Sequence, residues 1–431
     1  LIERVYSRIK NALERVLREN NVEAEVSLQG SIAKDTWLSG EYDLDIFVLF
    51  PEEWSREEID NYGFKLLLQT AKEIGKYTIR YAEHPYVRVY VEGVEADLVP
   101  AIKVSDPRKA KTAVDRTPFH TRYVIEHLDQ AGRDDVRLLK KFMKTIGVYG
   151  AEIRVKGFSG YMVELLVITY GSFHNVLRNA VKWKPPVYIN TLNMPYRGFR
   201  EVIGFLRRKY PDSIVYAPAP VDPSRNAGAA VSSRSLALFS IASRCYLENP
   251  SKDFFYRTRL DYSFNELISQ AIGRCIFFLI LPLLTKLPPE TLWGELDRIA
   301  DRLWKLLKLF DFKPVYYSIW SNEDSLAIIG FELEECILPI YKCREGPPHY
   351  VFDRVHSFIE KHYSSSISGP WVGRDGLLKV LTSRKYRFIQ DILIDRFKEY
   401  LVPPHFRNIK PVIVSGLSQN FYDLFHTPYF P

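Results

Sequence analysis

Cysteine is scarce in this chain of 431 residues, and its four copies form no metal-binding pattern. Cys245, Cys275, Cys336 and Cys343 include no Cys-x-x-Cys pair, and no histidine cluster accompanies them. This spacing excludes the common zinc sites and gives no disulfide framework. We therefore expect reduced thiols.

The sequence also lacks an apolar run long enough to cross a membrane. The longest run, CIFFLILPLL from Cys275, has about ten residues, whereas a membrane helix needs roughly 20. We interpret it as a buried strand. The first residues show no signal-peptide pattern, so we expect a cytoplasmic protein that makes no membrane contact.

Neither sign of charge is in strong excess. The chain has 59 Lys and Arg against 52 Asp and Glu, which gives a net charge of +7 and a pI near 8.9. This mild basicity is compatible with a polyanionic partner but does not demand one. The length exceeds that of one ordinary hydrophobic core, so we expect about two to four domains.

The hydrophobic periodicity predicts an α+β multidomain protein with three domains. Residues 1–130 mix helices and strands, residues 131–248 are helical, and residues 249–431 form a last α+β body and tail. Within the last domain, a strand, a helix and two strands over about residues 273–345 form a βαββ unit of the kind found in RNA-recognition-like sheets.

Several predicted elements are definite enough to be compared with the structure. The first domain contains a hairpin that turns at Glu92-Gly93 between two alternating strands. The second contains a Pro-rich loop and then a helix that starts near Asn226 and ends near Cys245. The other elements are helices at 1–20, 32–38 and 291–310 and strands at 23–28, 42–50, 275–283, 315–319 and 326–333.

Two acids interrupt the apolar strand in GSIAKDTWLSGEYDLDIFVLF, which begins at Gly30. Asp43 and Asp45 are two positions apart, so they project from one face of the strand while Leu44 projects from the other. Asp97 stands on a later strand with the same alternation. Three carboxylates on one face repel one another unless a cation lies between them, and Mg²⁺ is a hard cation suited to such oxygens.

The Gly-Ser pair before this strand fits the same chemistry. Gly30 permits a close approach of the backbone, and Ser31 opens a predicted helix whose free N–H groups favour phosphate. A phosphate seat beside three acids indicates phosphoryl transfer of the two-metal type. An Asp-x-Asp pair alone is usually a solvated strand face, and a lone Gly-Ser pair is a turn, but the complete constellation is much more specific.

These residues resemble the nucleotidyltransferase signature of the polymerase-beta superfamily. Together with further blocks they resemble the archaeal class I CCA-adding enzymes, which are tRNA nucleotidyltransferases: IRYAEHPYVRV, GVEADLVPAI, AVDRTPFH, VRLLKKFMKTIGVYGAEIRVKGFSGY and PVDPSRNA. The blocks cover most of residues 1–230, and the C-terminal half resembles the family in element order more than in residues. The resemblance implies a polymerase-beta-like head with a mixed sheet, a helical neck that recognises the base, and an RNA-recognition-like body with a tail.

The resemblance implies that Asp43, Asp45 and Asp97 are the catalytic residues and hold two Mg²⁺ ions. Asp97 is expected to attend the ion that activates the attacking 3′-hydroxyl of the tRNA. Family members often have Glu where this chain has Asp43, which keeps the charge with a shorter reach. Many have Arg where this chain has Lys34, which keeps the charge without the bidentate fork.

The resemblance also implies a nucleotide-binding set. On the residues alone, His120, Lys140 and Tyr149 would be interpreted as a loop histidine, a solvated lysine and a core tyrosine, and Arg225 as a surface charge. In the family pattern Arg225 reads the Watson–Crick edge of the incoming base, because a guanidinium offers several donors in a fixed fork. The full implied set is Ser31, Lys34, His120, Lys140, Tyr149 and Arg225.

The implied reaction is the template-independent addition of C, C and A to the 3′ end of tRNA from CTP and ATP, with release of pyrophosphate. The implied partner is tRNA, held by its acceptor stem and T-arm, and the sequence leaves a monomer and a homodimer open. A poly(A) polymerase or a terminal uridylyltransferase shares the Gly-Ser pair and the three acids and is the alternative enzyme. A catalytically silent RNA-binding protein is the alternative of another class.

Overall fold

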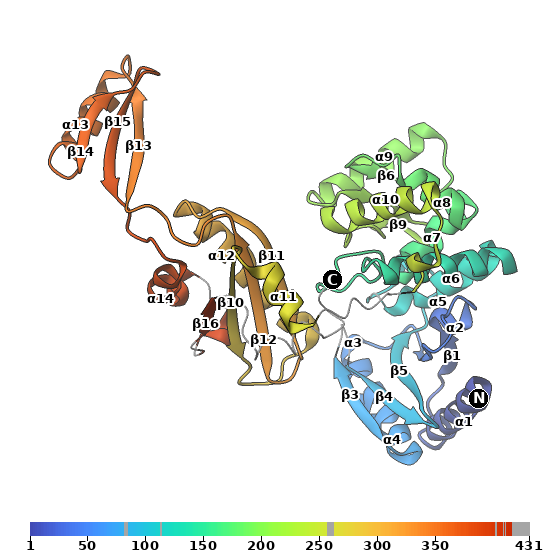
Figure 1. The fold of residues 1–431 in the computed structure, drawn as a ribbon. Helices are drawn as coiled ribbons and strands as arrows, with labels where there is room; N and C mark the ends of the chain where they lie inside the picture. The colour runs from blue at the N-terminus through green and yellow to red at the C-terminus, as the bar shows by residue number, and fades with distance from the viewer. Residues whose placement is uncertain are drawn as a thin grey trace. The chain divides into compact units, whose positions relative to one another are not determined.

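The structure is a computed structural model that describes residues 1–81, 85–112, 114–256, 263–400, 403–407, 409 and 411–415. The chain forms two compact units, Leu1–Thr258 and Arg259–Pro431, and each is described by itself (Figure 1). The division into three domains stays a prediction. None of the described helices has the length and apolarity to cross a membrane.

The first unit begins with a five-stranded mixed sheet whose strand order is β1-β2-β5-β4-β3. β2 and β5 are parallel, and the other neighbours are antiparallel. The apolar stripes of two helices, α1 and α4, pack on one face of the sheet against Leu44, Ile46 and Leu98. The elements are α1 (Ile2–Glu19), β1 (Glu25–Gln29), α2 (Gly30–Ala33), β2 (Asp43–Phe50), α3 (Arg56–Glu58), a π-helix (Ile59–Gly63), α4 (Phe64–Ile74), β3 (Tyr77–Tyr81), β4 (Pro85–Val91) and β5 (Val94–Ile102).

Most of the predicted elements of this sheet are confirmed, including the hairpin that turns between β4 and β5. The prediction of a helix over residues 32–38 was wrong, because α2 ends at Ala33. Asp35 adopts a positive φ of 53°, which breaks the helix, and Thr36 follows it with its hydroxyl bonded to Glu164. The side chain of Glu164 comes from a distant helix, so nothing in the local sequence signals this early end.

Helices make up most of the rest of the first unit. One face of α6 is apolar, and its Val136, Leu139 and Phe142 are fully buried in the second core of this unit. The helices are α5 (Thr117–His127), α6 (Gln130–Thr145), α7 (Gly160–Tyr170), α8 (Phe173–Ala180), α9 (Tyr196–Lys209) and α10 (Ser233–Glu248), with two-strand pairs β6 (Val187–Tyr188) with β7 (Val215–Tyr216) and β8 (Pro218–Ala219) with β9 (Asp222–Asn226).

The predicted helix start near Asn226 was wrong. Asn226 ends β9, and its buried side chain accepts from the backbone N–H of Ala217 and donates to the carbonyl of Val215. α10 begins seven residues later, where the Ser232 hydroxyl accepts from the backbone N–H of Ser235 and caps the helix. Asn226 therefore closes the β8–β9 hairpin, and a turn connects it to α10.

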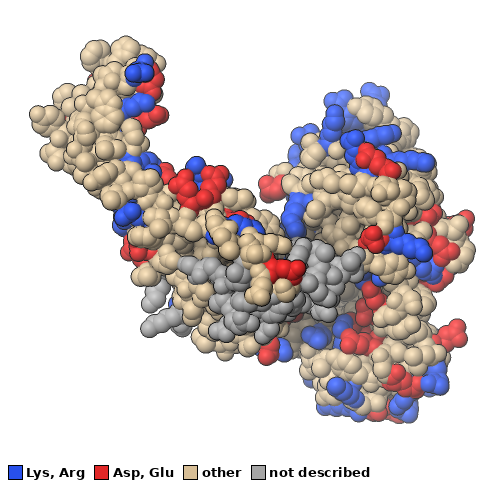
Figure 2. Space-filling view, viewed as in Figure 1, with Lys and Arg blue, Asp and Glu red and all other residues tan. Residues whose placement is uncertain are grey.

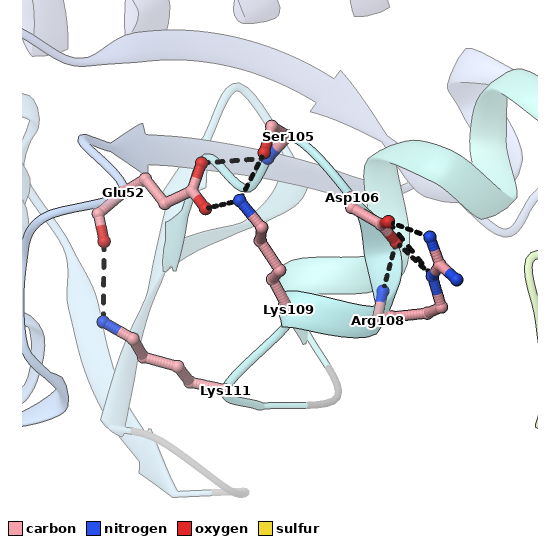
Figure 3. A network of polar contacts seen from close by, with 6 residues as sticks. All are labelled: Glu52, Ser105, Asp106, Arg108, Lys109 and Lys111. Atoms are coloured by element: carbon pink, nitrogen blue, oxygen red, sulfur yellow. Dashed lines mark hydrogen bonds and ion pairs between the residues drawn. The ribbon is translucent and has the colours of Figure 1, made fainter.

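Largely exposed side chains connect the loops that follow β2 and β5 (Figure 3). Glu52 accepts from the backbone N–H of Ser105 and from Lys109 Nζ, each at 3.2 Å, while its own carbonyl lies 3.5 Å from Lys111 Nζ. The hydrogen bond from Lys109 lowers the pKa of Glu52. Exposed contacts of this kind add little stability, but they hold the loop that leads from the sheet to α5.

The second unit contains the predicted βαββ arrangement, which is confirmed, and adds β16 to its sheet in the order β11-β12-β10-β16. The apolar run from Cys275 forms the largely buried strand β10, as predicted, and the strand ends at Pro282. Residues 341–383 form a second, three-stranded sheet in the order β13-β15-β14, which the sequence did not predict. The elements are α11 (Phe264–Ala271), β10 (Cys275–Pro282), α12 (Pro289–Leu309), β11 (Pro314–Ser321), β12 (Leu326–Leu333), β13 (Tyr341–Pro348), α13 (Phe352–Tyr363), β14 (Ser368–Val372), β15 (Leu377–Ser383), α14 (Ile389–Tyr400) and β16 (Val412–Ser415).

A disulfide joins Cys275 to Cys336, so the expectation of reduced thiols was wrong for these two residues. Cys275 begins β10 and is the register partner of Leu333, the last residue of the antiparallel neighbour β12. Cys336 follows three residues later, which brings the two Cα atoms to 5.2 Å although 61 positions separate them in the sequence. Cys245 and Cys343 are free thiols.

Candidate functional site

Two of the predicted catalytic acids lie side by side on the central strands of the first sheet. Asp45 on β2 is the register partner of Asp97 on β5, and Asp43 is two positions earlier on β2. Leu44 and Ile46 are fully buried on the opposite face, so the predicted alternation is confirmed. The parallel pairing of β2 with β5 therefore gathers the acids on the face that α1 and α4 leave uncovered.

Arg88 on β4 contacts this group and was not predicted from the sequence. It is the register partner of Asp97, and its Nε and Nη2 donate to the two oxygens of Asp97 at 2.7 and 2.8 Å. Its Nη1 donates to Glu95 at 2.6 Å. The hydrogen bond with Asp97 raises the pKa of Arg88, so this cation offsets part of the negative charge at all physiological pH values.

The electrostatics of the acids fit a hard cation. Burial raises the pKa of Asp45 to about 6, and the charges of Asp97 and Asp43 contribute to this shift. Burial also raises the pKa of Asp43, with Asp97 contributing, against the opposing effect of Arg88. Among the described residues, no group of three or more His, Cys, Asp or Glu side chains is arranged to hold a metal ion. The unfavourable negative charge and the oxygen donors nevertheless suit Mg²⁺, since a cation there would relieve the repulsion.

Gly30 lies directly against the carboxylate of Asp45. Gln29, the last residue of β1, is the register partner of Asp45, and the chain then turns at Gly30 with a φ of +70°. A Cβ at this position would come within 1.9 Å of Asp45 Oδ2. The turn therefore needs glycine, and it brings the predicted phosphate seat at Ser31 next to the acids.

A buried basic cluster joins the end of α2 to α6 and α7. Lys34 Nζ donates to Glu164 Oε2 at 2.6 Å, and Thr36 Oγ1 donates to Glu164 Oε1 at 2.7 Å. Lys140 Nζ donates to the carbonyl and the hydroxyl of Thr36 at 2.9 and 3.1 Å. Burial lowers the pKa of Lys140 to about 8, and the nearby Glu164 opposes this shift. The structure thus brings together Lys34 and Lys140, two residues of the implied nucleotide-binding set.

Tyr149 and His120 lie around this cluster. The hydroxyl of Tyr149 is 2.9 Å from the position that a Cβ on Gly160 would take, and Lys140 Cε is 4.0 Å from the same position, so Gly160 leaves room for both side chains. The ring of His120 packs against that of Tyr161 at 4.2 Å. Burial lowers the pKa of His120 to about 4, and Lys34 and Arg116 lower it as well, so the imidazole is neutral at pH 7.

Arg225 stands on the exposed face of β9. Within the described part of the chain, no hydrogen bond or ion pair involves its side chain. Asp222, on the same strand, forms an ion pair with Arg116 at 3.4 Å, and Arg116 immediately precedes α5, which carries His120. The strand that presents Arg225 is therefore tied to the segment that presents His120.

Three family descriptions match successive parts of the chain. Residues 9–120 match the nucleotidyltransferase domain, residues 134–256 the second domain of tRNA nucleotidyltransferase, and residues 275–402 the C-terminal domain of the CCA-adding enzyme. A CCA-adding enzyme of Sulfurisphaera tokodaii is 41% identical over 384 residues, which cover 89% of this chain and 85% of that protein. The chain belongs to the CCA-adding enzyme family.

Other CCA-adding enzymes have similar identity. That of Sulfolobus acidocaldarius is 38% identical over 395 residues, which cover 91% of this chain and 88% of that protein. Among solved structures, the Cid1 poly(U) polymerase bound to MgATP has a TM-score of 0.44 at 16% identity and covers 62% of this chain and 90% of that chain.

In this member of the CCA-adding enzyme family, two residues of the site were not predicted from the sequence. They are Arg88 and Glu164. Arg88 alternates with buried valines on β4, so its face was predictable, but its pairing with Asp97 depends on the strand register. Glu164 carries the clearer signal, since it is the single charge in the apolar helix GYMVELLVITY. A buried carboxylate needs a partner, and such a residue marks an internal polar contact.

Proposed function

We propose that this chain adds C, C and A to the 3′ end of tRNA from CTP and ATP, without a nucleic-acid template and with release of pyrophosphate. The observation that carries the proposal is the register pairing of Asp45 with Asp97 beside the Gly30 turn, in a chain of the CCA-adding enzyme family. Phosphoryl transfer needs positioned phosphates and compensation of their charge. The Gly30 turn with Ser31 is proposed to position the phosphates, and the acids are proposed to hold the cations that compensate the charge.

Asp43, Asp45 and Asp97 are the residues that would hold the metal ions. Nucleotidyltransferases use divalent metals, and we propose two Mg²⁺ ions for this chain. Each carboxylate oxygen has a second lone pair, so Asp97 can bind a cation while it still contacts Arg88. Such cations lower the pKa of an attacking hydroxyl and neutralise charge on the phosphates.

The lysines of the basic cluster and the residues around them are proposed to contact the nucleotide. Ser31, Lys34, Lys140 and Tyr149 are proposed to bind the triphosphate, which is the anion that two neighbouring lysines attract. His120 is neutral at pH 7 because of its lowered pKa, and it is proposed to contact the nucleotide by hydrogen bonding and not by charge.

Base selection is proposed for Arg225. Its side chain is exposed and makes no hydrogen bond or ion pair with the residues that the structure describes, so its donors are available to the edge of a base. A guanidinium fork can donate to the acceptors of C and A, whereas the N–H groups at the corresponding edges of U and G would be left unpaired against it.

The proposed RNA substrate is tRNA, bound by its acceptor stem and T-arm. Lys and Arg side chains gather over the part of the first unit where α9 lies (Figures 1 and 2). Five basic residues of α9 belong to this surface: Arg197, Arg200, Arg207, Arg208 and Lys209. A surface of this kind suits RNA phosphates, and the α+β body of the second unit is proposed to grip the duplex by shape. A cytoplasmic location, and the choice between monomer and homodimer, stay predictions.

The decisive experiment is to sequence the products formed on tRNA that lacks its CCA end. The substrate is supplied with Mg²⁺ and CTP, ATP, UTP or GTP singly, and then with CTP and ATP together. We expect two C residues from CTP alone and a completed CCA end from the pair. Runaway addition of A or of U from a single nucleotide, without C addition, would favour the poly(A) polymerase or the terminal uridylyltransferase instead.

Replacing Asp97 separates the enzyme from a silent RNA-binding protein. Asp97→Ala should abolish nucleotide incorporation and leave tRNA affinity within about twofold, because the acid serves the reaction and not the RNA duplex. Asp106→Ala is the matched control, since Asp106 follows the same strand, lies at the surface and bonds to Arg108. Gel-shift binding and incorporation assays measure the two properties. Normal turnover by Asp97→Ala would refute the metal assignment.

A further inference from the structure

A buried glutamate lies at the centre of the basic cluster and has no part in the chemistry proposed above. Glu164 projects from α7 and has no exposed surface. A carboxylate that is fully removed from water is costly unless cations and hydrogen-bond donors surround it. The groups that compensate Glu164 therefore indicate what it does.

Both oxygens of Glu164 are engaged by groups from outside its own helix. Oε2 accepts from Lys34 at 2.6 Å, and Oε1 accepts from Thr36 at 2.7 Å and lies 3.6 Å from Lys140 Nζ. Because Lys140 also donates twice to Thr36, the four residues form one closed network. The network fixes the relative positions of two ammonium groups that are 106 positions apart in the sequence.

The two lysines keep donors for a ligand. An ammonium group has three N–H donors. Within the described residues, Lys34 donates one hydrogen bond and Lys140 donates two. Each lysine can therefore still donate to a phosphate oxygen without leaving the network.

We propose that Glu164 is a positioning residue that holds Lys34 and Lys140 as a charged, pre-oriented pair for the triphosphate of the incoming nucleotide. The proposal rests on the proposed function, because it takes these lysines as phosphate ligands. Two ammonium groups this close repel each other, and a carboxylate between them removes the repulsion while the cluster keeps a net positive charge. The donors that bind the triphosphate are then already in position, so less side-chain freedom is lost when the nucleotide binds.

The charge state of Lys140 agrees with this role. Burial lowers its pKa to about 8; Glu164 opposes the shift, and Lys34 and Lys144 add to it. These charged groups face Lys140 from three places, namely α7, the end of α2 and its own helix. Glu164 is the one among them that favours the ammonium form. Without its charge, Lys140 loses its proton at a lower pH.

The test is the Glu164→Gln variant, which keeps the size of the side chain and removes its charge. We expect the KM for CTP and for ATP to rise at least about tenfold, the equivalent of one hydrogen-bonded charge, while the KM for tRNA changes less than about twofold. The ratio of variant to wild-type KM should be larger at about pH 8.5 than at about pH 6.5, because acid restores the ammonium form of Lys140. Glu126→Gln, an exposed glutamate of α5, is the matched control and should match the wild type at both pH values.

A double variant decides the case if Glu164→Gln disturbs the fold, which circular dichroism would reveal. Lys34→Met/Glu164→Gln removes both charges of the 2.6 Å ion pair, so it leaves neither partner of that pair as an uncompensated charge in the interior. Because Glu164 is proposed to act on the nucleotide through Lys34 and Lys140, part of its effect is lost once Lys34 is replaced, and the double variant should raise the nucleotide KM by less than the product of the two single effects. Additive effects of the two changes, an unchanged nucleotide KM in folded Glu164→Gln, or the same rise at both pH values would each overturn the proposal.

The proposed function stands or falls separately. The wild-type chain either completes the CCA end or does not, and the behaviour of Glu164→Gln has no influence on that product. A wild type that adds CCA together with a Glu164→Gln variant of unchanged kinetics would refute the positioning role alone.

Discussion

Gly30 meets two demands at once, and they can be separated by experiment. Its backbone has a φ of +70°, and its missing side chain leaves the space that the carboxylate of Asp45 fills. Gly40, in the following loop, has a φ of +86°, but a Cβ added there would have no neighbouring atom within 4 Å. The two glycines therefore share the conformational demand and differ in the contact with the acid.

Gly30→Ala should abolish most of the activity, whereas Gly40→Ala should keep it. Each substitution places alanine in the left-handed region, at a cost of about 1–2 kcal/mol in the free energy of unfolding. Gly30→Ala must also displace Asp45, so we expect kcat to fall at least about 100-fold, since misplacing a reacting group by about 1 Å costs that much. Thermal denaturation and incorporation kinetics measure the two effects. Equal activity of the two variants would show that the contact with Asp45 does not matter.

At the scale of single residues, the sequence predicted the acids better than the groups that surround them. Asp43, Asp45 and Asp97 could be placed because a period of two assigns each side chain to a face. Arg88 and Glu164 could not be given partners, because the partners depend on strand register and on helix packing between distant segments. Sequence spacing contains neither kind of information.

At the scale of elements, the strands with one buried face were the most predictable. The hairpin of β4 and β5 and the βαββ unit were both confirmed, because alternation or a continuous apolar run is imposed by burial. The helix predicted from Asn226 failed for a specific reason. The Asn226 side chain accepts from the backbone N–H of Gly228, two residues later, and such local side-chain bonds compete with helix formation.

The correction changes how Arg225 is understood, and it gives a prediction. The sequence placed Arg225 in a loop before a helix, but it lies on β9, where its exposed side chain is followed by the buried Asn226. Arg225→Ala should reduce the preference for C and A over U and G by about 10- to 100-fold, the usual value of one or two lost hydrogen bonds. Its effect on the affinity for the triphosphate should be smaller.

Single-nucleotide incorporation with all four nucleotides measures this preference. Arg234→Ala is the matched control, because Arg234 is also exposed, on α10, and is not part of the predicted site. If Arg225→Ala lowers kcat/KM equally for all four nucleotides, the residue has a phosphate-binding or structural role and does not read the base.

At the scale of the whole molecule, the chain has two compact units with separate cores. The predicted acids, the basic cluster and Arg225 all lie in the first unit, so the chemistry proposed here needs no side chain from the second. The disulfide lies in the second unit. A substitution at the disulfide can therefore change the stability of the second unit without altering the candidate site in the first unit.

Cys275→Ser should destabilise the second unit selectively. A bond that closes a loop of 61 positions constrains the unfolded chain and contributes about 4 kcal/mol in the chain-entropy description. For a unit of this size the loss corresponds to a fall of about 10 °C in the Tm of its transition. Calorimetry of the full chain should show this shift while the transition of the first unit stays in place, since multidomain proteins need not unfold in one step.

Two comparisons decide whether the bond is responsible. Cys343→Ser changes a free thiol of the same unit and should leave both transitions unchanged. A reducing agent should lower the Tm of the wild type to that of Cys275→Ser and leave the variant where it is. If the reductant has no effect on the wild type, the thiols are reduced in solution, and the packing of Cys275 in the core of the second unit accounts for any loss that its replacement causes.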